Sequence, residues 1–210
     1  MTPSYKFYRV CYRIARVLLG IVYRLDIQGK ENIPEGAAMI CANHSNLIDP
    51  FLLAFTFGIG THLHVLAKVE LFKIPILSTF LRKLGTIKVD RGILDIGSVK
   101  KTLGYLNKDE KVAIFPEGTR KPVENAVAAK SGAVRLAERA KVPIVPMFIP
   151  RKKPLFSKIS LVIGKPYIIE KQIERRSPQE YSRLADVLME KIEVLNPHPK
   201  TQKSGIMGQN

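Results

Sequence analysis

Cysteine is scarce in this chain. Cys11 and Cys41 are the only two cysteines among 210 residues, and two are too few to suggest a disulfide framework. We therefore expect a reducing, cytosolic setting. No internal repeat or linker divides the sequence, and 46% of its residues are hydrophobic. This length and composition predict one globular domain with a core large enough to fold alone.

Acidic residues are also few. Eighteen Asp and Glu residues stand against thirty-four Lys and Arg residues, which gives a net charge of +16. Such an excess predicts a polyanionic partner, either nucleic acid, an anionic membrane surface or a phosphorylated substrate. The sequence has no zinc-finger spacing and no RNA-binding signature, and its aromatic residues do not alternate with basic ones along a strand. We therefore expect no nucleic-acid partner, while charge alone does not choose between membrane and substrate.

The N-terminal segment lacks the uninterrupted apolar run of a membrane span. As a helix of about 3.6 residues per turn, residues 5–24 would carry a basic stripe on about a quarter of the circumference, with apolar side chains elsewhere. The stripe consists of Lys6, Arg9, Arg13, Arg16 and Arg24. These cations oppose a span, and no signal-peptide cleavage pattern follows. We expect residues 1–24 to form an amphipathic helix on an anionic membrane surface, although the pattern also suits a helix packed on its own domain.

The rest of the chain alternates between two kinds of segment. Short apolar runs rich in Val and Ile predict strands at residues 37–42, 62–66, 86–89, 111–115, 143–149 and 159–163. Helical spacing is found at residues 50–57, 71–84, 97–107, 126–140 and 178–195. This order predicts a single α/β domain over residues 25–195, with a mostly parallel central sheet flanked by helices. The polar residues 196–210 predict a flexible tail.

A first polar motif follows the strand predicted at residues 37–42. It reads Asn43-His44-Ser45-Asn46-Leu47-Ile48-Asp49-Pro50. His44 is a candidate general base because neutral imidazole accepts a proton near neutral pH, and Asp49 can fix its tautomer. Asp49 before Pro50 is also typical of a helix N-cap, in which the carboxylate binds the free amides of its own helix. A turn into the helix would fold His44 back towards the Asp49 carboxylate.

A second motif, Phe115-Pro116-Glu117-Gly118-Thr119-Arg120, follows the strand predicted at residues 111–115. Its Pro and Gly allow a sharp exit that exposes backbone amides. Arg120 carries a planar guanidinium that can hold a phosphate through two parallel hydrogen bonds. Glu117 would repel a phosphate, so we expect it to accept a hydrogen bond from a substrate hydroxyl or to orient a neighbouring cation; a loop salt bridge is the alternative. Both motifs lie at carboxyl ends of strands, where α/β sheets bind ligands.

These two motifs match NHxxxxD and FPEGTR without a substitution, and two looser blocks, residues 68–91 and 142–146, follow in the expected order. Over roughly residues 28–165 the sequence therefore resembles the glycerophospholipid acyltransferases of the 1-acylglycerol-3-phosphate acyltransferase type. The resemblance implies acyl transfer from acyl-CoA or an acyl carrier protein thioester to the sn-2 hydroxyl of lysophosphatidic acid. The product is phosphatidic acid, made at the cytoplasmic face of the cell membrane without a metal or other cofactor.

The resemblance also implies roles for particular residues. His44 and Asp49 are the catalytic pair, and the substrate site contains Lys68, Arg91, Glu117, Gly118, Thr119 and Arg120. Arg91 and Arg120 are expected to hold the phosphate, and residues 142–146 form a wall near the acyl donor. Residues 121–124 depart from the small polar residues common in relatives, so the resemblance does not define the local shape of the acceptor pocket.

Three alternatives remain at this stage. An acyltransferase of this kind can act instead on glycerol 3-phosphate or another lysophospholipid. A metal-dependent hydrolase would use His44 and Asp49 together with His62 and His64, which share one face of a strand. A non-enzymatic polyanion-binding protein would explain the charge but not the two motifs.

Overall fold

The structure is a computed structural model that describes residues 4–90, 95–117, 131–170, 172 and 176–198. Its strands are β1 (Arg24–Gln28), β2 (Ala38–Ala42), β3 (Leu63–Lys68), β4 (Ile87–Val89), β5 (Lys111–Ile114), β6 (Ile144–Phe148) and β7 (Lys158–Ile163). Its α-helices are α1 (Tyr5–Val22), α2 (Asp49–Phe57), α3 (Pro75–Lys83), α4 (Ile96–Leu106), α5 (Gly132–Ala140) and α6 (Pro178–Val194). Two short 3-10 helices, η1 (Lys30–Asn32) and η2 (Val69–Lys73), complete the described elements.

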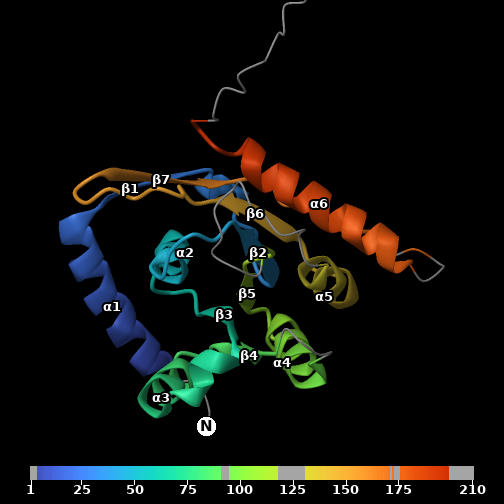
Figure 1. Cartoon of the computed structure of the whole chain (residues 1–210), viewed down its shortest axis with the longest axis horizontal. Helices are drawn as coiled ribbons and strands as arrows, with labels where there is room; N and C mark the ends of the chain where they lie inside the picture. The colour runs from blue at the N-terminus through green and yellow to red at the C-terminus, as the bar shows by residue number, and fades with distance from the viewer. Residues whose placement is uncertain (1–3, 91–94, 118–130, 171, 173–175, 199–210) are drawn as a thin grey trace, which may run out of the picture.

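The strands form one sheet in the order β1-β7-β6-β2-β5-β3-β4 (Figure 1). Neighbouring strands are parallel except β6 and β7, which confirms the prediction of a mostly parallel α/β sheet. From β2 the chain crosses to β3 on one side, and it later returns from β5 to β6 on the other. This change of direction around β2 creates a topological switch point, the usual ligand site of such sheets.

The central strand β2 is buried on both faces, as crossover helices require. Met39 and Cys41 point into a core completed by α4, α5 and α6. Ala38, Ile40 and Ala42 point into the opposite core, against α1 and α2. All five side chains are fully buried. Two apolar layers therefore hold the carboxyl end of β2 in a fixed place.

The structure corrects the expected end of the N-terminal helix. Helix α1 ends at Val22, and Tyr23 is already extended with φ −133° and ψ 138°. Arg24 is the first residue of β1 and pairs with Lys158 of β7, so it does not belong to the basic stripe of the helix. The sequence analysis missed β1 because this edge strand is polar at both ends and only partly buried.

Other predicted boundaries differ less. The helix predicted at residues 71–84 is divided at Ile74 into η2 and α3, because Pro75 begins a new helix. The helix predicted at residues 126–140 is described only from Gly132 onward. Most of the tail predicted at residues 196–210 also lies outside the described residues.

Helix α1 presents three different sides. Tyr8, Tyr12 and Leu19 belong to the inner side, which packs against α2 and the sheet. A second side carries the exposed cations Lys6, Arg9, Arg13 and Arg16. A third side leaves Val10, Ile14, Val17, Leu18 and Ile21 at least half exposed. Among the described helices, none has the length and apolar character needed to cross a membrane.

Candidate active site

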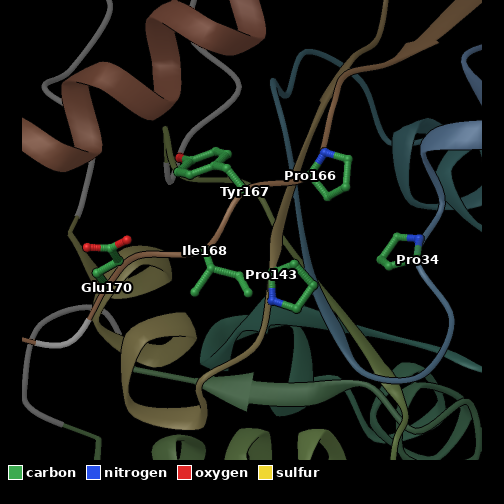
Figure 2. A pocket seen from close by; sticks show the side chains of 6 residues that line it. All are labelled: Pro34, Pro143, Pro166, Tyr167, Ile168 and Glu170. Carbon is green, nitrogen blue, oxygen red and sulfur yellow. The ribbon is translucent and has the colours of Figure 1, made fainter.

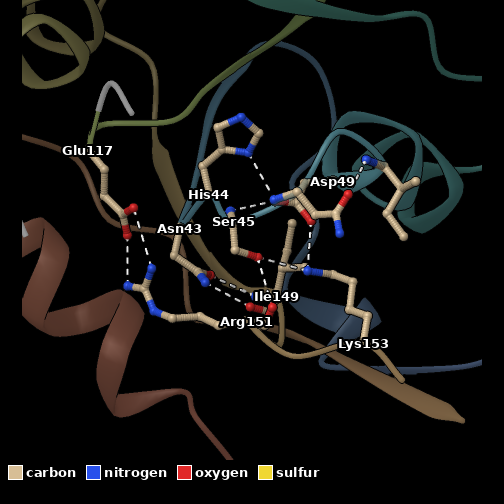
Figure 3. A network of polar contacts seen from close by, with 10 residues as sticks. Asn43, His44, Ser45, Asp49, Glu117, Ile149, Arg151 and Lys153 are labelled. Atoms are coloured by element: carbon tan, nitrogen blue, oxygen red, sulfur yellow. Dashed lines mark hydrogen bonds and ion pairs between the residues drawn. The ribbon is translucent and has the colours of Figure 1, made fainter. Parts of the chain in front are cut away.

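His44 lies in the loop that leaves β2, where its ring is 14% exposed. Its Nδ1 is 2.9 Å from Oδ2 of Asp49 (Figure 3). Because an ionised carboxylate only accepts hydrogen bonds, this contact fixes the tautomer in which Nδ1 carries the proton and Nε2 carries the lone pair. The ring also stacks on Phe115, with centroids 4.1 Å apart and planes at 20°. The first and second motifs therefore meet at His44.

Asp49 is the first residue of α2 and is fully buried. Its carboxylate points away from its own helix, because Oδ2 accepts hydrogen bonds of 2.7 Å from the backbone N–H of both Ser45 and Asn46. The alternative role as an ordinary N-cap is thus wrong, and Ile48 occupies that position. Burial raises the pKa of Asp49, but the hydrogen bonds from His44, Ser45 and Lys153 outweigh it and hold the pKa below its usual value.

Asn43, beside the catalytic candidate, joins the loop to the neighbouring strand. Its Nδ2 donates a hydrogen bond of 2.7 Å to the carbonyl oxygen of Ile149, and its Oδ1 accepts one of 2.8 Å from the N–H of the same residue. Asn43 is fully buried. The side chain therefore continues the β2–β6 pairing beyond the last strand residues and sets the position of His44.

Glu117 in the second motif has a cationic partner. Its side chain is 9% exposed, and Oε1 accepts a hydrogen bond of 2.8 Å from Nη2 of Arg151, with a longer contact of 3.4 Å between Oε2 and Nη1. The same guanidinium also pairs with Glu193 of α6. The expected orienting of a neighbouring cation and the alternative loop salt bridge both describe this contact.

The segment that follows β6 completes the site, and the sequence analysis did not identify it. Ile149, Arg151 and Lys153 contact the two motifs in turn (Figure 3). Lys153 places its Nζ 2.9 Å from Oδ1 of Asp49. The available signal was the run Arg151-Lys152-Lys153 directly after a buried strand, since β6 is the neighbour of β2 and ends at the same edge.

The remaining predicted site residues are placed less completely. Lys68 is the last residue of β3 and is exposed at the same edge of the sheet, with β5 between it and β2. Arg91, Gly118, Thr119 and Arg120 lie outside the described residues. Of the predicted wall at residues 142–146, the last three residues are the buried start of β6, beside β2, and the first two precede the strand. The contacts with Asn43, Asp49 and Glu117 come instead from residues after this strand.

His62 and His64 lie at the other end of the strands. His64 is in register with Val112, which pairs with Met39 near the start of β2, whereas His44 follows the end of that strand. The imidazoles donate hydrogen bonds to the carbonyl oxygens of Leu84 and Gly85, at 2.8 Å and 3.0 Å. The four-residue metal site of the hydrolase alternative is therefore wrong. Within the described ranges, no three His, Cys, Asp or Glu side chains are grouped to hold a metal ion.

A separate depression of about 740 Å³ is not part of this site (Figure 2). It is lined by Pro34, Pro143, Pro166, Tyr167, Ile168 and Glu170. Pro34 and Pro143 precede β2 and β6 along the chain. The depression therefore lies at the amino ends of these parallel strands, opposite His44.

Comparison with known proteins points to one family. The family model described as Acyltransferase matches residues 24–150. A 1-acyl-sn-glycerol-3-phosphate acyltransferase of Bacillus subtilis is 30% identical over 197 residues, which cover 90% of this chain and 96% of the relative. The enzyme of the same name from Saccharomyces cerevisiae is 31% identical over 154 residues, covering 71% of this chain and 50% of the relative.

A solved structure supports the fold. The crystal structure of a 1-acyl-sn-glycerophosphate acyltransferase from Thermotoga maritima superimposes with a TM-score of 0.64 at 24% identity, covering 92% of this chain and 80% of that chain. The residues matched by the family model include both motifs. The resemblance noted from the motifs is confirmed, and the chain belongs to the acyltransferase family.

Proposed function

We propose that this protein is a 1-acylglycerol-3-phosphate O-acyltransferase that transfers an acyl group from a thioester to the sn-2 hydroxyl of lysophosphatidic acid. The observation that carries the proposal is the contact of 2.9 Å between the partly exposed His44 and the fully buried Asp49, at the switch point of the sheet. The names of the relatives from Bacillus subtilis and Saccharomyces cerevisiae support this acceptor. Phosphatidic acid would be the product, for use in phospholipid synthesis.

In the proposed reaction His44 is the general base. Its Nε2 accepts the proton of the acceptor hydroxyl while the oxygen attacks the thioester carbonyl carbon, and Asp49 stabilises the imidazolium that forms. The tetrahedral intermediate collapses by breaking the carbon–sulfur bond. The imidazolium then returns the proton to the thiolate, so that the products are the new ester and a free thiol. No covalent enzyme intermediate is needed.

The second motif would bind the phosphate of the acceptor. We assign Arg120 and Arg91 as its cationic contacts, with the amides of Gly118 and Thr119 and the ammonium of Lys68 as further donors. Glu117 would act indirectly. Its pairing with Arg151 neutralises a carboxylate that would otherwise repel the phosphate.

Membrane association would bring the enzyme to its lipid acceptor. The exposed apolar side of α1 lies next to its basic side, which is the arrangement that binds an anionic interface. Leu155 and Phe156, 70% and 76% exposed, lie in the loop before Ser157, whose carbonyl oxygen accepts a hydrogen bond from the N–H of Arg24 just after α1. We therefore propose that α1 and this loop contact the cytoplasmic face of the cell membrane together.

The test is acyl transfer by the purified protein in liposomes. Lysophosphatidic acid, glycerol 3-phosphate and a lysophospholipid with a larger headgroup are each supplied with acyl-CoA and with acyl carrier protein thioesters. We expect phosphatidic acid from lysophosphatidic acid, and the donor that supports it identifies the carrier. Turnover of glycerol 3-phosphate alone would replace the acceptor, and no product with any pair would refute the proposal.

A further inference from the structure

Lys153 is a buried cation that has no part in the motif-based mechanism. Its side chain is 1% exposed, and the carboxylate of Asp49 beside it is 0% exposed. Lysine is almost never buried without a partner, because removing an ammonium from water costs several kcal/mol. Its Nζ is 2.9 Å from Oδ1 of Asp49 and donates a hydrogen bond of 2.9 Å to Oγ of Ser45. The burial of Lys153 therefore depends on the catalytic loop.

The two oxygens of Asp49 serve different partners. Oδ2 faces His44 and the amides of Ser45 and Asn46, whereas Oδ1 faces Lys153 (Figure 3). In the described part of the chain, His44 and Lys153 are the titratable groups in contact with Asp49. The nearby guanidinium of Arg151 is turned towards Glu117 and Glu193.

This arrangement has an electrostatic consequence. A buried carboxylate with no other cation would attract a proton onto the neighbouring imidazole, and an imidazolium cannot act as a base. The ammonium of Lys153 already balances the charge of Asp49 and repels a second positive charge. It also fixes the carboxylate in the rotamer that directs Oδ2 at His44.

We propose that Lys153 is a positioning residue that acts through Asp49 to keep His44 unprotonated and correctly oriented before the acceptor hydroxyl arrives. The inference rests on the proposed function, because it assigns His44 as the base. It extends the site beyond both motifs, to a residue on the segment after β6.

The activity test compares Lys153→Met, Lys153→Arg and Lys152→Met with wild type. Lys152 is the matched control, since it is the exposed neighbour and its loss changes the net charge equally. We measure kcat/KM between about pH 5 and about pH 9. For Lys153→Met we expect the acid limb of the kcat/KM profile to move to higher pH by about one unit. The rate at neutral pH should fall several-fold. Lys153→Arg and Lys152→Met should keep the limb in place.

The second readout does not depend on turnover. Titration of the His44 imidazole is followed by nitrogen NMR, with its signal assigned by comparison with His44→Ala. The midpoint should move to higher pH in Lys153→Met but not in Lys152→Met. Lys153→Gln, which keeps a hydrogen-bond donor without the charge, serves the same purpose if the Met variant does not fold.

The outcomes separate the two claims. An unmoved midpoint, together with an equal loss of rate at every pH, would show that Lys153 only braces the loop, and the inference would be overturned. A wild-type protein that makes no phosphatidic acid would refute the proposed function instead. The NMR titration would then still decide whether Lys153 controls the charge on His44.

Discussion

At the scale of single residues, the contact between His44 and Asp49 depends on a turn. The two residues are five positions apart and cannot share one helical face, but Asp49 begins α2 and its carboxylate points back at the loop. Two backbone amides and one ammonium hold that carboxylate in addition to the imidazole. Such preorganised donors would keep the proposed base in position without reorganisation during the reaction.

For His44→Ala we expect acyl transfer to fall by ~10²–10⁴-fold, because that is the usual contribution of a general base. The fold should persist, since the ring is partly exposed and stacks on Phe115, which directly follows β5. The measurement is initial rate together with the thermal unfolding midpoint. His198→Ala, at an exposed histidine after α6, is the control. Near-normal turnover of His44→Ala would remove this residue from the mechanism.

At the scale of elements, a stack of rings attaches α1 to the sheet. Tyr8 packs on His62, His62 on His64, and His64 on Tyr105, with centroids between 3.6 and 4.4 Å apart. His64 also contacts Glu110, whose other oxygen accepts a hydrogen bond from the hydroxyl of Tyr5. The two histidines that suggested a metal site thus join α1, β3 and α4.

The stack predicts a loss of stability in mild acid. Burial lowers the pKa of both His62 and His64, so the unfolded chain binds more protons than the folded one below about pH 6.5. The free energy of unfolding should therefore fall as the pH drops through this range. It is measured by denaturant unfolding at several pH values.

His62→Gln tests the cause of that pH dependence. It removes one titrating group and keeps a donor for the Leu84 carbonyl. The free energy of unfolding should therefore change less with pH than in wild type. His198→Gln, at an exposed histidine, should leave it unchanged. Equal slopes for wild type and His62→Gln would contradict the assignment.

The exposed side of α1 gives a prediction about membranes. Val17 and Ile21 are 63% and 68% exposed, and burying such side chains in an interface contributes roughly 1.5–3 kcal/mol each. Changing both to Glu should lower binding to anionic liposomes by at least about tenfold, because apolar contact is lost and negative charge is added. Liposome flotation is the measurement.

The control for this prediction lies on another helix. Val194 is 77% exposed at the end of α6, which covers the face of the sheet opposite α1. Val194→Glu should leave liposome binding intact, and all variants should keep the wild-type unfolding temperature. Equal losses from both changes would mean that the apolar side of α1 is not a specific contact.

At the scale of the whole molecule, three strand ends meet to make the site. The strands β2, β5 and β6 are adjacent, and the segments after them carry His44, Glu117 and Lys153. Three contacts, Asn43 with Ile149, Glu117 with Arg151, and Asp49 with Lys153, join these segments. The fold therefore couples stability to site geometry.

Asn43→Ala tests that coupling. It would leave a buried N–H and a buried carbonyl of Ile149 without partners, which we expect to lower the free energy of unfolding by about 2–5 kcal/mol. Activity should fall as well, because the His44 loop loses its tie to β6. Denaturant unfolding gives the stability. Asn46→Ala, in the exposed part of the same loop, should cost less than about 1 kcal/mol; a similar cost for both would contradict this role.

Much of this arrangement was predictable from local pattern. The apolar runs predicted β2, β3, β4, β5, β6 and β7 with small boundary errors. β2 and β6 are buried along their whole length and therefore read as continuous apolar segments. β1 was missed because Arg24, Asp26 and Gln28 interrupt its apolar pattern and the strand is only partly buried. The helix limit at Arg24 was wrong because tertiary pairing with Lys158 overrides helical spacing.

The amino-acid sequence by itself determined the α/β class, because alternating strand and helix patterns are local. It also determined the two motifs and the family, because each motif is a run of neighbouring residues after a strand. Only the tertiary structure decided that Lys153 pairs with Asp49, that Arg151 pairs with Glu117 and which side of α1 faces the core. The two ion pairs depend on β6 lying beside β2. Strand order arises from the packing of the whole sheet, and no local spacing of residues encodes it.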